Sequence, residues 1–187
     1  MLLYFIRHGQ TDWNKDMRMQ GQSDIPLNEN GRKSAIEAGK TLANTHIDLA
    51  FSSPLKRAKE TAELVLAGRD IPIIEDKRIE EICFGICEGM RGRDENGQPV
   101  GCFAEFFAHP EQYKAPENGE DAKMLCARTW NFLEDITTRE ELQDKSILIA
   151  THGAALQSMM LWVNKQPICD FWKSGLKKNC SVTKVEV

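Results

Sequence analysis

Several features that would fix a function class are missing from this 187-residue sequence. Its 24 lysine and arginine residues are mixed with 28 aspartate and glutamate residues, for a net charge of −4. The chain therefore has no basic field for a nucleic-acid backbone or an anionic membrane, and we expect neither as a partner. No apolar run approaches the length of a membrane span, and the start, MLLYFIRHG, lacks the basic region and length of a signal peptide. These absences predict a cytoplasmic protein that recognises anions locally.

The six cysteines also lack the spacing of a structural framework. They form no C-x-x-C pair and no metal-type pattern with histidine, which favours reduced thiols over disulfides or a zinc site. No internal repeat or low-complexity linker divides the chain, and its 41% hydrophobic content is enough for one core. We expect a single domain over residues 1–187, without a resident metal or cofactor.

Hydrophobic periodicity predicts strands that alternate with helices. The strands are expected at residues 2–6, 48–53, 71–75, 146–151 and 181–187, and the helices at 28–44, 54–67, 119–141 and 153–163. Ser53 and Pro54 are suited to begin the second helix as its cap and first residue, and Asn118 or Asp121 could cap the third. The alternation predicts an α/β three-layer sandwich: a mostly parallel central sheet with helices on both faces.

Three of the predicted strands end in cationic or imidazole side chains. The strand at 2–6 leads into Arg7 and His8, the strand at 48–53 leads toward Arg57, and the strand at 146–151 leads into His152. In open α/β sheets, sites form beyond the carboxyl ends of the strands, so parallel neighbours would bring these groups together.

The surroundings of these residues fit the same edge of the sheet. Arg57 lies in the first part of its helix, and helical side chains lean toward the helix N-terminus. Glycines follow both histidines, at Gly9 and Gly153, where a missing Cβ and freedom for positive φ would let backbone N–H groups approach a ligand. The helix expected from residue 153 would add its positive N-terminal end.

Two guanidiniums and two imidazoles in one place suit a phosphoryl group, whose oxygens match the planar fork of arginine. Each residue also has a structural interpretation: a single strand-end histidine or helix-face arginine commonly serves packing alone. Asn14 is either a further phosphate donor or a turn residue. Glu80 and Glu81 alternate in direction, and spacing does not decide which one faces the site.

Two further features leave alternatives open. The aromatic residues between positions 103 and 113 either wall a substrate pocket or cover one end of the sheet, and aromatic burial favours covering. His8, His152 and acidic residues could instead ligate a metal in a metal-dependent phosphoesterase, which the absent metal spacings disfavour. A phosphate- or phosphoprotein-binding module without turnover is the third possibility.

The ordered motifs resemble the histidine phosphatase superfamily, the phosphoglycerate-mutase-like proteins, over nearly the whole chain. The resemblance rests on Arg7-His8-Gly9-Gln10-Thr11 with Trp13-Asn14, Gln20-Gly21, Asp24-Ile25-Pro26-Leu27 with Gly31, Ser52-Ser53-Pro54-Leu55 with Arg57-Ala58 and Thr61-Ala62, Glu81 followed by Gly85 and Glu88-Gly89, and Thr151-His152-Gly153. A lone R-H-G tripeptide is weak evidence for a family, whereas the full ordered series of motifs is specific to this one.

This resemblance implies a role for each candidate residue. His8 would be the nucleophile that takes the phosphoryl group, held through its other ring nitrogen by a backbone carbonyl. The phosphate would be surrounded by Arg7, Arg57 and a protonated His152, with Asn14 and Gln20 as further ligands. Glu81, four residues before the glycine of the family's turn, would be the proton donor in place of Glu80, and no metal is implied.

The resemblance also frames the reaction. Cys87 stands where many relatives have tryptophan, and Gly119-Glu120-Asp121 stands where they have Gly-Glu-Ser; both departures fall at the expected rim of the site. A water acceptor gives a phosphomonoesterase, and a sugar-acid hydroxyl gives a cofactor-dependent phosphoglycerate mutase. Because family mutases are generally longer, we expect a phosphatase of small phosphorylated metabolites. The oligomeric state stays open.

Overall fold

Five strands form one sheet in the computed structural model, which describes all 187 residues. Their order across the sheet is β3-β2-β4-β1-β5, and the strands are β1 (Leu2–Arg7), β2 (Leu49–Ser52), β3 (Ile73–Glu75), β4 (Ser146–Thr151) and β5 (Val182–Glu186). All neighbours are parallel except β5, which runs antiparallel to β1. The predicted, mostly parallel α/β sheet is confirmed.

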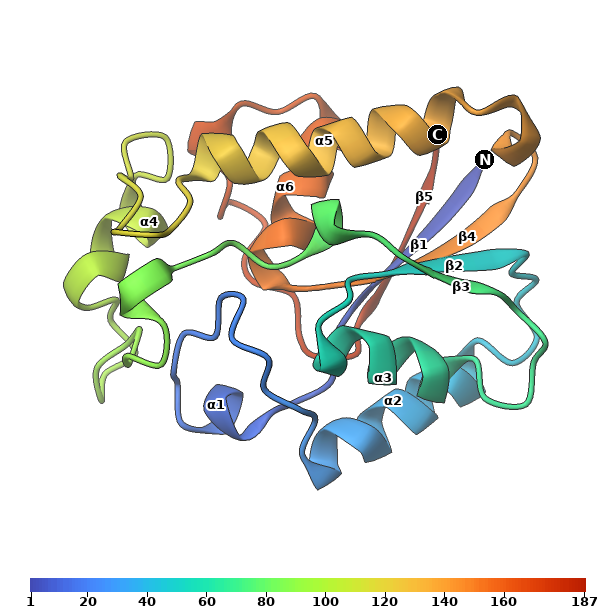
Figure 1. Cartoon of the computed structure of the whole chain (residues 1–187), viewed down its shortest axis with the longest axis horizontal. Helices are drawn as coiled ribbons and strands as arrows, with labels where there is room; N and C mark the ends of the chain where they lie inside the picture. The colour runs from blue at the N-terminus through green and yellow to red at the C-terminus, as the bar shows by residue number, and fades with distance from the viewer.

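Helices cover both faces of this sheet (Figure 1). One face carries α2 (Glu29–Thr41) and α3 (Lys56–Val65), and the other carries α5 (Ala122–Thr138) and α6 (Gly153–Asn164). The short helices α1 (Asp12–Lys15) and α4 (Ala104–Ala108) lie beyond the carboxyl end of β1, opposite the two chain termini. Single 3₁₀ turns occur at Lys77–Ile79, Gly85–Cys87, Gly101–Phe103, Glu140–Leu142 and Ile168–Asp170. None of the helices combines the length and apolarity needed to cross a bilayer.

The core lies in two layers because successive strand side chains face opposite ways. Leu3 and Phe5 of β1 pack in the larger layer, toward α5 and α6, whereas Tyr4 and Ile6 pack in the layer with α2 and α3. Strand β4 is buried along its whole length, as expected of a central parallel strand covered on both faces. His8 and His152 therefore directly follow strands that are buried at the centre of the sheet.

Two helices begin later than the sequence predicts. Helix α3 starts at Lys56 because Ser53 does not cap it: the Ser53 hydroxyl accepts from the Leu55 N–H and contacts His152 instead. Helix α5 starts after Asp121, whose carboxylate accepts from the Met124 N–H. Asn118 is excluded as its cap by a left-handed backbone, with a φ of 59°.

Candidate active site

Strand register brings the two histidines together. Arg7 of β1 is the register partner of Thr151 of β4, so the next residues, His8 and His152, leave the sheet at the same level. Their ring centroids are 5.1 Å apart, and both side chains are buried. The parallel neighbours assumed in the sequence analysis are present, and the strand ends converge.

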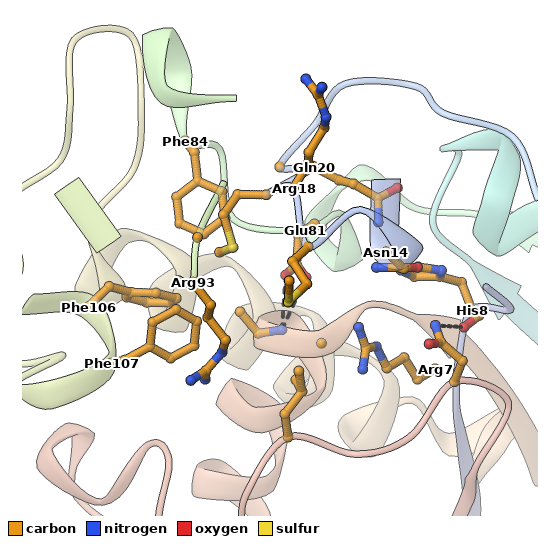
Figure 2. Close-up of a pocket in the computed structure, with 18 of the residues that line it drawn as sticks. Arg7, His8, Asn14, Arg18, Gln20, Glu81, Phe84, Arg93, Phe106 and Phe107 are labelled. Carbon is orange, nitrogen blue, oxygen red and sulfur yellow. Dashed lines mark hydrogen bonds between the residues drawn. The ribbon is translucent and has the colours of Figure 1, made fainter. Parts of the chain in front are cut away.

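A cavity of about 310 Å³ opens at this edge. Seven of the eight candidate residues line it: Arg7, His8, Asn14, Gln20, Arg57, Glu81 and Gly153. The exception is His152, which lies behind the ring of His8. Figure 2 shows Arg7, His8 and Asn14 together at one end of the cavity, which we call the His8 end, with Glu81 beside it.

The ring of His8 has one nitrogen committed and one free. Its Nδ1 lies 2.7 Å from the carbonyl oxygen of Gly9, which requires a proton on Nδ1 and leaves the lone pair on Nε2. Burial, with Arg57 and Arg7 nearby, holds the pKa of His8 well below its ordinary value of 6.5. Asn179 fixes the same residue from the backbone side by donating to its carbonyl (2.8 Å). His8 is therefore a neutral imidazole whose Nε2 lone pair is free.

Arg57 is buried and held at every nitrogen. Its Nε donates to His152 Nδ1 (3.2 Å), and its two terminal nitrogens donate to the carbonyls of Ser23 (2.7 Å) and Gly21 (2.6 Å). Burial lowers its pKa to about 10, so the guanidinium stays charged at neutral pH. The side chain points back toward the sheet edge, as expected, and the remaining hydrogens of its terminal nitrogens are available to an anion.

His152 is neutral in this arrangement, and the protonated ring expected from the resemblance is wrong here. Its Nδ1 accepts from Arg57, so its single proton sits on Nε2, 2.7 Å from the hydroxyl of Ser53. Burial, followed by Arg57 and His8, lowers its pKa well below 6.5. His152 therefore orients Arg57 and supports His8, and contributes no positive charge of its own.

Arg7 provides the donor without a partner at this site. One terminal nitrogen donates to the Lys177 carbonyl (2.6 Å), whereas Nε is buried and makes no hydrogen bond. A buried unpaired donor is costly unless a ligand satisfies it. Because Arg7 lines the cavity beside His8, an anion bound there would pair with this N–H.

Glu81, and not Glu80, faces the cavity. Its carboxylate accepts from the backbone N–H groups of Ala154 (3.1 Å), Ala155 (3.0 Å) and Ile82 (3.0 Å). The first two are the open donors at the N-terminus of α6, which the sequence analysis expected to face the ligand. That helix end is used to hold the carboxylate in place.

The two glycines act by packing, and the expected positive φ is absent at both. A Cβ on Gly9 would lie 2.7 Å from the Gly31 carbonyl oxygen, and the Gly9 N–H is already bound by Thr61. A Cβ on Gly153 would lie 2.8 Å from Leu176 and 3.5 Å from Arg7 Nε. Gly9 allows close packing of α2, and Gly153 keeps the cavity open between Arg7 and Glu81.

Thr11 orients both candidate amides, a role the sequence analysis missed. Its N–H donates to Asn14 Oδ1 (3.2 Å), and its hydroxyl donates to Gln20 Oε1 (2.9 Å). With both amide oxygens occupied, the amide N–H₂ groups of Asn14 and Gln20 are the groups left for a ligand. The only signal in the sequence was the T-x-x-N spacing of a helix cap, which Thr11 also forms.

Replacing Thr11 with valine should weaken anion binding more than turnover. The variant keeps the size of the side chain but removes the hydroxyl, so we expect KM and the inhibition constant of vanadate to rise about two- to tenfold. Thr11→Ser retains the hydroxyl and should restore both constants. A change in kcat with unaltered vanadate binding would contradict this role.

A model of the histidine phosphatase superfamily (branch 1) matches residues 3–187. The chain belongs to this superfamily. It is 32% identical over 167 residues to a 2,3-bisphosphoglycerate-dependent phosphoglycerate mutase of Cytophaga hutchinsonii, covering 88% of this chain and 78% of the mutase. It is also 32% identical over 155 residues to PhoE of Bacillus subtilis, an uncharacterized phosphatase, covering 83% of this chain and 73% of PhoE.

Solved histidine phosphatase structures share the fold. Bacillus stearothermophilus YhfR superposes with a TM-score of 0.87 at 35% identity, covering all of this chain and 91% of YhfR. The resemblance inferred from the motifs is thereby confirmed for family and fold. Both mutases and phosphatases occur among the relatives, so membership alone leaves the acceptor open.

A half-buried ion pair supports the backbone of Glu81. Arg128 of α5 pairs with Glu120 (2.8 Å) and donates to the carbonyls of Glu80 (2.7 Å) and Glu81 (2.8 Å). Glu120 also accepts from the N–H of Cys83 (2.9 Å). Glu120, which this chain shares with the Gly-Glu-Ser of the relatives, thus contributes a brace for the carboxylate segment that no spacing in the sequence indicated, whereas the departing residue, Asp121, caps α5.

The aromatic residues between positions 103 and 113 both cover the core and wall the cavity. Phe103 and Phe106 are fully buried in the larger core layer, while Phe106 and Phe107 also line the cavity. Figure 2 shows Phe84, Phe106 and Phe107 opposite the His8 end, with Glu81 between. Trp172 packs against Phe106 and Phe107 and completes what we call the aromatic end of the cavity. No cluster of three or more His, Cys, Asp or Glu side chains is arranged to hold a metal, and the six cysteines are unpaired.

The two buried histidines predict a loss of stability in mild acid. Their pKa values lie below 6.5 in the folded chain, so the unfolded chain takes up protons first as the pH falls. The free energy of unfolding should have its full value above about pH 6.5. Below that pH it should decrease by up to about 1.4 kcal/mol per pH unit for each histidine. Urea unfolding between pH 7.5 and 5.5 measures this slope. The same slope should persist when exposed His46 and His109 are replaced by glutamine; a flat profile would contradict the assignment.

Proposed function

We propose that this protein is a metal-independent phosphomonoesterase that acts on small phosphorylated metabolites through a phosphohistidine on His8. One observation carries the proposal: the free Nε2 of His8 lies in a cavity flanked by two charged guanidiniums, one with an unpaired buried N–H. A neutral nucleophile with preorganised cations around it is the arrangement that phosphoryl transfer needs.

The first chemical step transfers the phosphoryl group to His8. Nε2 forms a bond to phosphorus as the bond to the ester oxygen breaks, and protonated Glu81 delivers its proton to the departing alkoxide. Arg7 and Arg57 stabilise the charge on the equatorial oxygens. Asn14 and Gln20 supply neutral donors to the same oxygens.

The second step releases phosphate. Ionised Glu81 takes a proton from water, the hydroxyl oxygen bonds to phosphorus, and the bond to Nε2 breaks. His8 returns to its neutral state with its Nδ1 proton still on the Gly9 carbonyl, and Glu81 is again protonated. No step in this mechanism uses a metal ion, and metal independence, which the sequence also predicts, stays a prediction for the assay below.

The relatives named as phosphoglycerate mutases favour a second candidate, in which a sugar-acid hydroxyl replaces water as acceptor. The two candidates differ in their products. With 3-phosphoglycerate and a trace of 2,3-bisphosphoglycerate, a mutase yields 2-phosphoglycerate, whereas the proposed phosphatase yields glycerate and inorganic phosphate.

The proposal is tested by assaying a panel of phosphomonoesters in excess chelator. We expect full turnover without metal, inhibition by vanadate, and acid-labile phosphate on the chain after an alkaline quench. Turnover that disappears with chelator would support the metal-dependent alternative instead. Phosphate binding without turnover of any ester would support a binding module. The unpaired cysteines are consistent with the cytoplasmic location that we also propose.

A further inference from the structure

The aromatic end of the cavity is an apolar wall of packed rings. Phe106 packs edge-on against Phe84 and Trp172, with ring centroids 5.5 Å and 5.3 Å apart. The indole N–H of Trp172 donates to the Phe106 carbonyl (2.8 Å), which fixes this pair. Phe107 extends the wall, 5.2 Å from Trp172. Phe84 and Phe106 are buried behind the wall, whereas Phe107 and Trp172 are only half-buried and offer apolar surface to a ligand of similar size.

Two arginines among the cavity-lining residues lack a carboxylate partner, and one of them, Arg93, lies at the aromatic end. The guanidinium of Arg93 stacks 4.5 Å from the centre of the Phe107 ring and donates to the Gly97 carbonyl (2.6 Å). Arg18 donates to the Gly89 carbonyl (3.2 Å). Elsewhere in the chain Arg78, Arg128 and Arg139 each form an ion pair, whereas neither Arg18 nor Arg93 has an acidic oxygen within 4.0 Å.

The charges around the cavity are therefore divided into two sets. Arg7 and Arg57 lie at the His8 end, and Arg18 and Arg93 line the remainder, with Glu81 as the single acidic residue among those lining the cavity. One phosphoryl group needs only the first set. A cation stacked on an aromatic ring keeps its N–H edge free for an anion while its face is packed.

We propose that the aromatic end binds the leaving group of the substrate and selects phosphomonoesters whose leaving group joins a ring-sized apolar body to a second negative charge. Arg93 pairs with that charge, and Phe107 with Trp172 packs against the apolar body. This specificity rests on the proposed phosphatase function of the same cavity.

Four substrates separate the two features. Phenyl phosphate has the ring alone, 4-carboxyphenyl phosphate has the ring and the charge, 3-phosphoglycerate has the charge alone, and glycerol 1-phosphate has neither. We expect kcat/KM to be highest for 4-carboxyphenyl phosphate and lowest for glycerol 1-phosphate. Added salt should reduce the advantage of the carboxylated ester.

Single variants assign the effect to residues. Arg93→Gln should lower kcat/KM for 4-carboxyphenyl phosphate about tenfold and leave phenyl phosphate nearly unchanged. Phe107→Leu should lower both aryl esters and spare glycerol 1-phosphate. Arg91→Gln is the matched control, because Arg91 is exposed, lies two residues away and does not line the cavity. It should leave all four substrates as in the wild type.

The possible outcomes test leaving-group selection separately from the proposed phosphatase function. Equal kcat/KM for phenyl and 4-carboxyphenyl phosphate, or equal losses for both in Arg93→Gln, would overturn the leaving-group selection while turnover itself stands. No turnover of any of the four esters and no phosphohistidine would overturn the phosphatase. Thermal unfolding of each variant separates a lost contact from a lost fold.

Discussion

Replacing His8 with alanine should abolish both turnover and covalent labelling. The variant loses the only imidazole whose free nitrogen faces the cavity, because both nitrogens of His152 are bound to Arg57 and Ser53. Loss of a covalent nucleophile lowers kcat by roughly four to six orders of magnitude in comparable enzymes. The measurement is single-turnover release of phosphate together with acid-labile label on the chain.

His46→Ala is the matched control for this variant, because the His46 side chain is 80% exposed and remote from the cavity lining. It should label and turn over like the wild type. Calorimetry measures the binding of vanadate to His8→Ala. Binding that is retained would show that Arg7 and Arg57 still form the anion site in this variant. Labelling that persists in His8→Ala would place the covalent intermediate on another residue.

Replacing Glu81 with glutamine should lower kcat by about 10²- to 10⁴-fold, the range expected for a general acid. The amide oxygen of glutamine can still accept from the Ala154 and Ala155 N–H groups, so the fold of this segment is preserved. Binding of vanadate should change little, because the anion donors remain in place. Esters with very acidic leaving groups should lose less in the first step, since they need little protonation.

Glu80→Gln is the paired control, because it changes the adjacent carboxylate without altering the cavity lining. Burial raises the pKa of Glu80, so a perturbed carboxylate beside the site exists that does not face it. Steady-state kinetics of the two variants on one substrate decides between them. Similar losses in both variants would show that the proton donor has been assigned to the wrong residue.

The sequence predicted the sheet, and the edge where the candidate residues converge, because strong local signals coincide there. The apolar runs SILIAT and LLYFI are typical of buried strands, and each leads directly into a histidine motif. Since parallel neighbours bring their carboxyl ends together, the convergence of His8, Arg57 and His152 follows from chain order and one assumption about pairing. That assumption is met by the register of β1 and β4.

Long-range contacts explain what the sequence did not predict. The protonation of His152 depends on which atom of Arg57 reaches it across 95 positions of the chain, and no local pattern encodes that. The packing role of Gly9 depends in the same way on the approach of Gly31. The start of α3 shifted because the Ser53 hydroxyl serves His152 rather than the helix. In each case tertiary hydrogen bonding outweighed a local preference.

The supporting residues of the site were also outside the reach of spacing rules. Arg128 lies in the middle of α5, where an arginine ordinarily faces solvent, and only the folded chain shows it holding the carbonyls of Glu80 and Glu81. The aromatic end is similar, because Phe84 and Trp172 lie on either side of α5 in sequence and both pack against Phe106 in the folded chain. The sequence therefore indicates the residues of the candidate phosphate site more clearly than those of the aromatic end.

The position of the phosphoryl group on the histidine ring tests the central claim most directly. The phosphorylated intermediate is accumulated with a slowly hydrolysed phosphomonoester and quenched in alkali. Phosphorus NMR and mass spectrometry of the peptide that contains residue 8 then locate the phosphoryl group. Because Nδ1 is held by the Gly9 carbonyl, we predict phosphate on Nε2 of His8 alone. Phosphate on Nδ1, on His152, or on no histidine under turnover conditions would contradict the account.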